Sequence, residues 1–243
     1  MIRLEEIEKL ARKYQISPVA VAREYCQHNI LATLYSQKGT QNLLFKGGTA
    51  LRIIYGSPRF SEDLDFTGIH NITYPEIEDI LTNVLSDLQF WTIDADLKEA
   101  KKTTGGYLAK IDFSLHSFKF LIKIEISFRK STRKIASVVS PIKNDYIHTY
   151  SIIHLPLEEL INGKLNALLS RAKPRDWYDF YFFLHNQMLG LKHKELLQEL
   201  LKKLEKSRID FKKELKEFLP ASHQMILKDF KKTLEQKITD YLE

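Results

Sequence analysis

The segment from Lys46 to Phe66 reads KGGTALRIIYGSPRFSEDLDF, and its succession of residue types decides how the surrounding chain is interpreted. A short apolar run precedes it, two glycines interrupt that run, and apolar and acidic residues alternate at its end. Apolar alternation predicts a strand, and glycine pairs are typical of turns. We therefore expect, in order, a strand at 42–45, a glycine turn, a helix at 49–55, a turn at 56–58 and a second strand around 64–66.

Two aspartates, Asp63 and Asp65, lie two residues apart at the second of these strands. Side chains two apart on a strand point to the same face, and two neighbouring carboxylates can hold a hard divalent cation. An acidic surface patch would show the same pattern. The preceding residues favour the cation, because Gly47 and Gly48 let the backbone approach a phosphate closely and a helix N-terminus attracts negative charge.

The residues around the glycine turn extend this hypothesis from a metal to a nucleotide. Arg59 comes shortly before the two aspartates, and its planar guanidinium group is suited to phosphate oxygens. A strand, a Gly-Gly turn, a helix and an Asp-x-Asp pair, in this order, can hold a triphosphate together with its magnesium ion. We expect the phosphates to lie against Lys46, Gly47, Gly48, Thr49 and Arg59.

The rest of the chain divides into a mixed half and a helical half. Periodicity predicts two helices before the central segment, a helix and two antiparallel strands after it, and only helices beyond Pro156. We expect an α+β fold with a domain over residues 1–155 and a helical domain over residues 156–243. The expected helices are 4–14, 18–36, 75–90, 157–171, 174–187, 193–219 and 222–242, and the expected strands are 107–116 and 118–128.

Positive charge is concentrated in one part of the chain. Residues 98–145 hold 11 Lys/Arg and 4 Asp/Glu, although the net charge of the whole chain is only +6. Such a segment can attract the phosphates of a nucleic acid, or it can be a solvated lysine-rich surface. In the first interpretation, Lys119, Lys123 and Arg129 would contact an RNA acceptor.

Glu125 is the only acid on the expected strand 118–128, on the same face as Lys119 and Lys123. We interpret Glu125 as a third metal ligand for a site that holds two metal ions. The alternatives are a salt bridge between Glu125 and a neighbouring lysine, or Asp112 on the preceding strand as the third acid.

The helical half contains charged residues at apolar positions. Lys164 lies within an apolar stripe, one turn from Leu160 and from Leu168. It can extend its amine to solvent from the edge of the stripe, or it can be directed at a phosphate. Asp176 and Asp179 share one face of a helix that is otherwise rich in aromatic residues. Asp176 alone could be a carboxylate favoured by the helix dipole, but Asp179 repeats the charge.

Composition bears on the compartment. The chain has a single cysteine, Cys26, which excludes an intrachain disulfide framework and a cysteine-based zinc site. No apolar run is long enough to span a bilayer, and the charged N-terminal helix lacks the apolar stretch of a signal peptide. We expect a cytoplasmic protein with no membrane partner.

Four motifs in this order resemble the AbiEii/AbiGii toxin family of nucleotidyltransferases, which includes the MenT toxins. The first two are the run Gly47–Leu51 and the pattern Arg59-x-Ser61-x-Asp63-x-Asp65. The later two are Glu159 with Lys164, and Arg175-Asp176-x-x-Asp179. The resemblance covers residues 40–185 and leaves the N-terminal helices and the last 50 or so residues outside it.

The resemblance implies a polymerase β-like nucleotidyltransferase core followed by a C-terminal helical bundle. It implies an enzyme that uses a nucleoside triphosphate and Mg²⁺ or Mn²⁺, and that acts as the toxin of a toxin–antitoxin or phage-defence system, with an antitoxin from a neighbouring gene. Some members modify the 3′ end of tRNA. By motif match, Asp63 and Asp65 hold metal, Ser61 and Arg175 lie at the nucleotide, Lys164 meets the triphosphate and Asp176 is a second essential acid. A protein or small-molecule acceptor, and a non-catalytic nucleic-acid-binding module of the same fold, are the alternatives.

Overall fold

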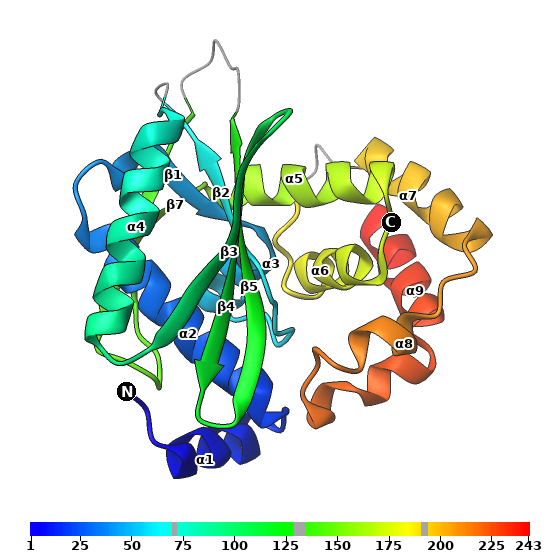
Figure 1. The fold of residues 1–243 in the computed structure, drawn as a ribbon. Coiled ribbons are helices and arrows are strands. Elements are labelled where there is room, and N and C mark those ends of the chain that lie inside the picture. The colour runs from blue at the N-terminus through cyan, green and yellow to red at the C-terminus, as the bar shows by residue number, and fades with distance from the viewer. Residues whose placement is uncertain (70–71, 129–134, 191–193) are drawn as a thin grey trace. The chain divides into compact units, whose positions relative to one another are not determined.

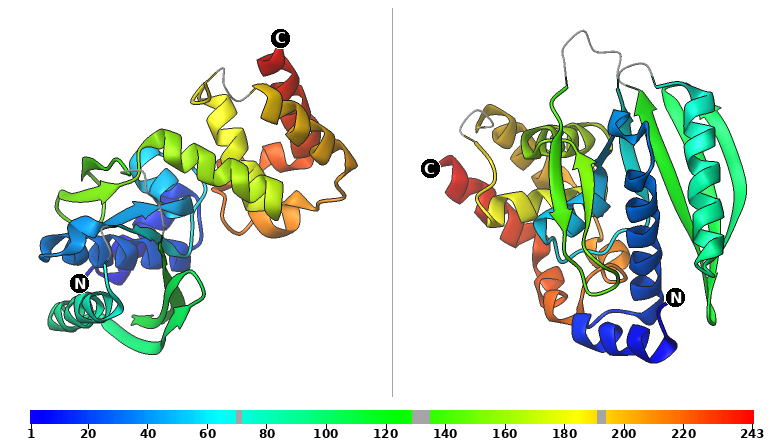
Figure 2. Two further views of the ribbon diagram at one scale, coloured as in Figure 1. Left: turned by 90° about the horizontal axis from the view of Figure 1, so that it is seen from above. Right: turned by 90° about the vertical axis from the view of Figure 1, so that its left-hand side faces the viewer.

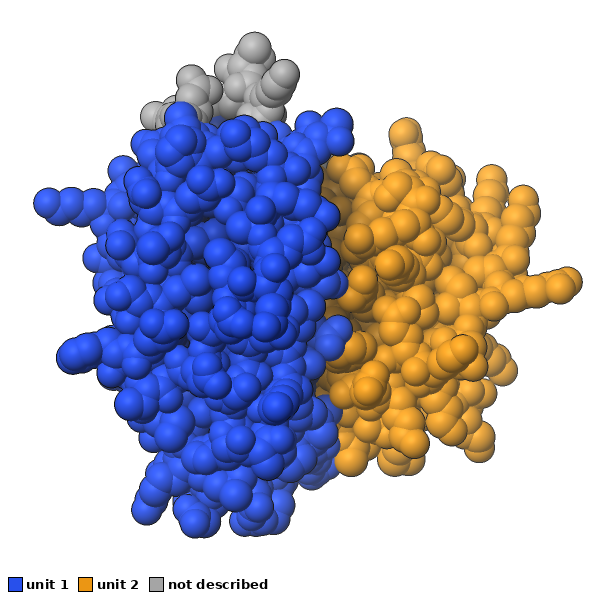
Figure 3. Space-filling model, viewed as in Figure 1, with its two compact units in different colours: residues 1–56, 60–156 blue, residues 57–59, 157–243 orange. Residues whose placement is uncertain are grey.

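The computed structural model describes residues 1–69, 72–128, 135–190 and 194–243. The chain forms two compact units, which Figure 3 distinguishes by colour. Unit 1 comprises Met1–Gly56 and Phe60–Pro156, and unit 2 comprises Ser57–Arg59 and Leu157–Glu243. The three residues Ser57–Arg59 therefore leave unit 1 and belong with the C-terminal helices, immediately ahead of the two aspartates in the sequence.

Unit 1 is built on a seven-stranded mixed sheet, with the strand order β3-β4-β5-β2-β1-β7-β6 (Figure 1). The pairs β2–β5 and β1–β7 are parallel, and the other neighbouring pairs are antiparallel. The strands are β1 (Leu43–Lys46), β2 (Leu64–Gly68), β3 (Asp94–Thr103), β4 (Gly106–Leu115), β5 (Phe118–Phe128), β6 (Val138–Ile142) and β7 (Tyr150–His154).

Two long helices of unit 1, α2 (Pro18–Ser36) and α4 (Tyr74–Phe90), contact each other and cover one face of the sheet (Figures 1 and 2). Helix α2 begins at a proline, which suits the first helical turn, and α4 begins with a capping box between Thr73 and Glu76. The shorter helices are α1 (Leu4–Tyr14), α3 (Gly47–Tyr55) and the 3₁₀ turn η1 (Thr40–Asn42).

The core of unit 1 lies between the sheet and helices α2 and α4. Phe45, Phe66 and Ile126 are register partners on β1, β2 and β5, and all three are almost fully buried. Because side chains alternate along a strand, the residues next to these three point to the opposite face of the sheet. That opposite face carries the polar residues of the central segment.

In its described residues, unit 2 consists of helices and loops around an aromatic core. Trp177, Phe180 and Phe183 of α6 are fully buried, and Phe230 of α9 stacks on Tyr178. The elements are α5 (Leu157–Ser170), α6 (Pro174–His185), α7 (Lys194–Lys206), α8 (Phe211–Leu215), the 3₁₀ turns η3 (Ala221–His223) and η4 (Met225–Lys228), and α9 (Phe230–Leu242). No helix in the described part of the chain is long and apolar enough to cross a membrane.

Several helices begin or end at residues other than those predicted from the sequence. The expected helix 193–219 is wrong, because the chain leaves the helix after Lys206 and Asp210 starts a new one by accepting a hydrogen bond from the Lys213 amide. The expected helix 222–242 begins only at Phe230. Strands β3, β6 and β7 were not predicted from the sequence. By contrast, helices 4–14 and 18–36 and strand 118–128 are confirmed at both ends.

Candidate active site

Three charged residues lie side by side across the middle of the sheet in unit 1. Lys46 of β1 pairs in register with Asp65 of β2, and Asp65 pairs in register with Glu125 of β5. Register partners on neighbouring strands share a face, so the three side chains point to the face opposite the buried core. Asp65 is partly exposed and Glu125 is exposed. The sheet thus presents two carboxylates beside a lysine on its polar face.

Gly47 brings the backbone against Asp65. Its φ is +86°, a conformation that glycine adopts without strain, and a Cβ at this position would lie 2.1 Å from Asp65 Oδ2. Helix α3 begins at Gly47, so the Asp65 carboxylate lies at the start of that helix, where the helix dipole favours negative charge. The glycine turn therefore provides the space for one of the two acids.

Asp63 lies just before β2 and is held through its backbone. Its carbonyl oxygen accepts a hydrogen bond from Thr49 Oγ1 at 2.5 Å. The Asp63 side chain is 24% exposed to solvent. Lys123 Nζ lies 3.9 Å from Asp63 Oδ1. Lys46 reaches across β2 and donates to the hydroxyl of Ser127. In this structure Lys46 and Thr49 therefore contact the protein around the acids, and their contact with a nucleotide stays a prediction.

The donor set of this face fits a hard cation. Within the described ranges, no three His, Cys, Asp or Glu side chains gather into a group that could hold a metal. Magnesium does not require such a cage, since it is usually bound by one or two carboxylates together with water and substrate phosphates. Asp63, just before β2, and Asp65, within β2, supply two such carboxylates. Glu125 as a third ligand stays a prediction.

The lysines of β3, β4 and β5 are interleaved with acids. Lys101 and Lys110 share Glu99, and Lys98 lies between two aspartates. Lys119 is exposed on β5. Arg129 and three further cationic residues of the segment 98–145 lie outside the described residues, which leaves seven cationic and four acidic residues in its described part. The described strands therefore offer a face of mixed charge.

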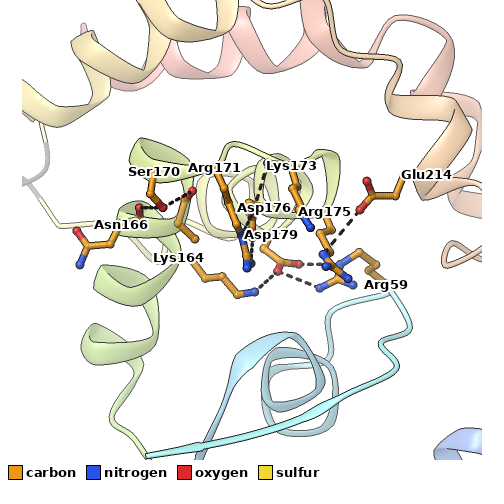
Figure 4. Close-up of polar contacts among 11 residues, drawn as sticks. Arg59, Lys164, Asn166, Ser170, Arg171, Lys173, Arg175, Asp176, Asp179 and Glu214 are labelled. Carbon is orange, nitrogen blue, oxygen red and sulfur yellow. Dashed lines mark hydrogen bonds and ion pairs between the residues drawn. The ribbon is translucent and has the colours of Figure 1, made fainter. Parts of the chain in front are cut away.

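Unit 2 contains a buried ion cluster centred on Asp179, which is fully buried in α6 (Figure 4). Arg59 donates two hydrogen bonds to its carboxylate, Nε to Oδ1 at 2.8 Å and NH2 to Oδ2 at 2.9 Å. Lys164 of α5 approaches from the other side, with Nζ 2.7 Å from Asp179 Oδ2. The carboxylate thus joins an arginine from the segment Ser57–Arg59 to a lysine from α5.

The opposite charges of this cluster keep one another ionised despite burial. Burial opposes the ionised form of Asp179, but Arg59 and Lys164 outweigh it and hold the pKa of Asp179 below its usual range. Burial likewise opposes the charged form of Arg59, while Asp179 raises the pKa of its guanidinium group. Arg59 is only 3% exposed. Its expected contact with phosphate stays a prediction, and its contacts here are those of a residue that orders Asp179 and, through it, Lys164.

Asp176 has a different set of partners. Both of its oxygens accept hydrogen bonds from Arg171 at 2.8 Å, and the Lys173 amide lies 3.3 Å from one of them, which caps the start of α6. The sequence leaves two roles open for Asp176, orienting Lys164 or acting as the general base. In this structure Asp179 makes the contact with the lysine (Figure 4), and the role of general base stays a prediction. Arg175 lies 3.7 Å from Glu214, so its contact with a nucleotide also stays a prediction.

Sequence reasoning missed the pairing of Asp179 with Arg59. Part of the signal was available, because an acid inside a run of aromatic residues requires a cationic partner, but no local pattern singles out Arg59 as that partner. It also missed Gln27 of α2, whose amide donates to the backbone of residues 61 and 62. No local pattern marks that glutamine.

Comparison with solved structures identifies the class of fold. JHP933 from Helicobacter pylori has a TM-score of 0.67 and 22% sequence identity, over 93% of this chain and 93% of that chain. MenT4, a nucleotidyltransferase toxin from Mycobacterium tuberculosis, has a TM-score of 0.64 and 14% identity, over 99% of this chain and 90% of that chain. At these identities the similarity shows the fold alone, and it confirms the expected nucleotidyltransferase fold.

The family is shown by a second comparison. The family model described as nucleotidyl transferase AbiEii toxin, Type IV TA system, matches residues 29–242, and the chain belongs to this family. The match confirms the resemblance and extends it through the C-terminal helices, which had been left outside it. No curated protein matches the sequence.

Proposed function

We propose that this protein transfers a nucleoside monophosphate from a nucleoside triphosphate to an acceptor hydroxyl and releases pyrophosphate. The observation that carries the proposal is the arrangement of Asp63 and Asp65 beside a glycine turn that starts a helix. Carboxylates suit the metal ion of a triphosphate, and the start of a helix suits its phosphates. Membership of the AbiEii family supports the same reaction class.

In this proposal Asp63 and Asp65 hold Mg²⁺ or Mn²⁺, which supplies charge stabilisation for the α-phosphate and the leaving pyrophosphate. Gly47 and Gly48 admit the phosphates to the backbone at the start of α3. Lys46 and Ser61 flank the nucleotide. Glu125, beside Asp65 on the same face of the sheet, is the candidate for a third ligand.

We propose that Lys164 neutralises the β and γ phosphates and that Asp179 sets the position of its amine. The hydrogen bonds from Arg59 to Asp179 support this role, because only three residues separate Arg59 from Asp63 in the sequence. Asp176, held by Arg171, keeps the start of α6 in place. Its role as an essential acid is then one of positioning.

We propose RNA, with the 3′ end of tRNA as the first candidate, as the acceptor. The support is the cationic excess of the segment 98–145, to which Lys119, Lys123 and Arg129 contribute. A protein or small-molecule acceptor is the second arm of the test, because the described lysines of this segment are interleaved with acids. The family further suggests a cytoplasmic toxin whose partner is an antitoxin encoded nearby.

The test is incubation of the protein with Mg²⁺, total RNA and cell protein, and each α-labelled nucleoside triphosphate in turn. We expect label in one RNA fraction, with one or two preferred bases, and none with Asp63→Asn or in the presence of a chelator. Label in protein would move the acceptor to the second arm. Equal labelling by wild type and Asp63→Asn, or no labelling of any fraction, would contradict the proposed transferase.

A further inference from the structure

Helix α2 buries an unusual set of polar side chains. Five of them are at most 4% exposed, and four have identified partners. Because a buried polar group is costly unless it is hydrogen-bonded, these partners indicate what the helix is built to hold. The five residues are Glu24, Gln27, His28, Asn29 and Thr33.

Gln27 holds the backbone immediately ahead of Asp63. Its side-chain nitrogen donates to the carbonyl oxygen of Ser61 at 3.0 Å and to that of Glu62 at 2.9 Å. The next carbonyl, that of Asp63, accepts from Thr49. Three consecutive carbonyl groups of a segment outside any helix or strand are therefore fixed by two buried side chains.

Two neighbours of Gln27 on α2 also contact the same segment, Arg23 directly and Glu24 through Arg52. Arg23 NH1 lies 3.1 Å from Glu62 Oε1. Glu24 binds Arg52 of α3, whose guanidinium carbon lies 3.3 Å from the ring centroid of Phe60. Arg23, Glu24 and Gln27 share one face of the helix, because residues three and four apart are neighbours on it. The side chains of that face contact residues 60–62 either directly or through Arg52.

We propose that Gln27 is a positioning residue of the candidate metal site, and that it sets the location of the Asp63 carboxylate through the carbonyls of Ser61 and Glu62. The inference rests on the proposed function. An irregular segment has no ladder of its own to fix it, and a ligand displaced by about 1 Å loses much of its value to a metal or a reacting group.

The test compares Gln27→Met with Asn29→Met. Asn29 is a matched control, because it is a buried amide on the same helix whose donor bonds to the Tyr25 carbonyl of that helix. Mn²⁺ affinity is measured by electron paramagnetic resonance on the full chain, with a melting curve for each variant. We expect Gln27→Met to weaken Mn²⁺ binding by about tenfold or more, the effect typical of residues that orient metal ligands, and Asn29→Met to leave it within about twofold.

A second variant covers the case in which Gln27→Met does not fold. Gln27→Asn keeps the amide but is one methylene shorter, so we expect it to reach one carbonyl at most and to weaken Mn²⁺ binding to a smaller extent. In the transfer assay kcat should fall for both Gln27 variants, while KM for the acceptor stays unchanged. A purely structural role would lower the melting temperature without these changes.

An Asp63→Asn arm separates this inference from the proposed function. Wild-type Mn²⁺ binding that Asp63→Asn abolishes, together with unaltered binding by a folded Gln27 variant, would overturn the role of Gln27 alone. Mn²⁺ binding that is equal in wild type and Asp63→Asn would overturn the proposed metal site itself, and the inference with it.

Discussion

The two aspartate pairs of this protein have opposite surroundings. Asp63 and Asp65 lie on the polar face of the sheet in unit 1 and keep part of their exposure. Asp176 and Asp179 are fully buried in unit 2, and both oxygens of each accept hydrogen bonds from an arginine. A carboxylate held in this way is already neutralised by protein, whereas one at a polar face can exchange a protein or water contact for a metal ion.

The difference teaches that two similar spacings, Asp-x-Asp and Asp-x-x-Asp, have separate uses. The first pair supplies ligands and the second fixes cations in place. Removing an acid of the first pair should therefore affect transfer with little loss of stability, whereas removing an acid of the second should lower stability and affect transfer only through the cations that it positions.

The largest effect is expected from Asp63→Asn. Charge stabilisation by a bound metal contributes several kcal/mol to a transition state, so we expect transfer to fall by about a thousandfold or more. The free energy of unfolding should change by less than about 0.5 kcal/mol, because the side chain is partly exposed and its nearest identified cation is 3.9 Å away. Labelled-nucleotide transfer and urea unfolding on one preparation would measure both. A large loss of stability would place Asp63 with the structural pair.

Asp179→Ala should lower stability, which Asp63→Asn leaves nearly unchanged, and it should also lower transfer because the Lys164 amine loses the carboxylate that positions it. It leaves the buried Arg59 and the partly buried Lys164 without their shared partner, and breaking a buried ion pair in this way costs about 3–5 kcal/mol. Glu214→Ala is the matched control in unit 2, because its contact with Arg175 is long and about one third exposed, and we expect at most about 1 kcal/mol. Urea unfolding compares the two. Similar small losses in the free energy of unfolding for both variants would show that the ion cluster around Asp179 contributes little to stability.

Gly47→Ala should combine strain with a clash. Gly56→Ala is its control, since both glycines have a positive φ but only Gly47 has a neighbour where a Cβ would lie. We expect each change to cost about 1–2 kcal/mol through the backbone, and Gly47→Ala to cost more because Asp65 must move. Only Gly47→Ala should abolish transfer. Equal behaviour of the two alanine variants in stability and transfer would contradict the close approach of Asp65.

The most gradual effect concerns the pH dependence of stability, which involves a different group in each unit. Burial lowers the pKa of His28 in unit 1 from 6.5 to about 4, with smaller and opposing effects of Glu24 and Arg52. The unfolded chain therefore binds a proton between pH 6.5 and 4 that the folded chain does not, and stability decreases as the pH is lowered through this window, by at most about 1.4 kcal/mol per pH unit. His28→Gln should remove that slope.

Asp179 acts in a lower window. Because its pKa is lowered in the folded state, its contribution is fully present above its ordinary pKa and is lost only as the pH falls through the folded value. Unfolding followed from pH 7 to pH 3 would measure both windows. A slope between pH 6.5 and 4 that persists in His28→Gln would show that other groups cause it.

The parts of the fold that the sequence predicted are those with one buried face. Strand β5 alternates buried and exposed residues along most of its length, and the two N-terminal helices have clear start signals. Strand β3 was missed because it is an edge strand whose side chains are mostly exposed, so its sequence DADLKEAKKT shows no apolar alternation. Strand β6 is the other edge and contains Pro141, which argues against a strand in sequence reasoning.

The candidate site was likewise predicted only in part. The Asp-x-Asp pair and the glycine turn are local, and their spacing alone predicted that they would come together. The partner of Lys164 was not predictable from spacing, because Asp176 and Asp179 differ only in which turn of α6 they occupy. Arg59 was expected to bind phosphate because it precedes Asp63 in the chain, but its side chain pairs with Asp179, 120 residues away.

The most direct test of the central claim is where the label of a nucleoside triphosphate goes when it is placed on the α or the γ phosphate. Nucleotidyl transfer dependent on Asp63 and Asp65 predicts that α label becomes covalently attached to the acceptor and that γ label leaves as pyrophosphate. Both signals should vanish together in Asp63→Asn and in Asp65→Asn. Attachment of γ label to the acceptor, or attachment of α label that survives both substitutions, would contradict the account.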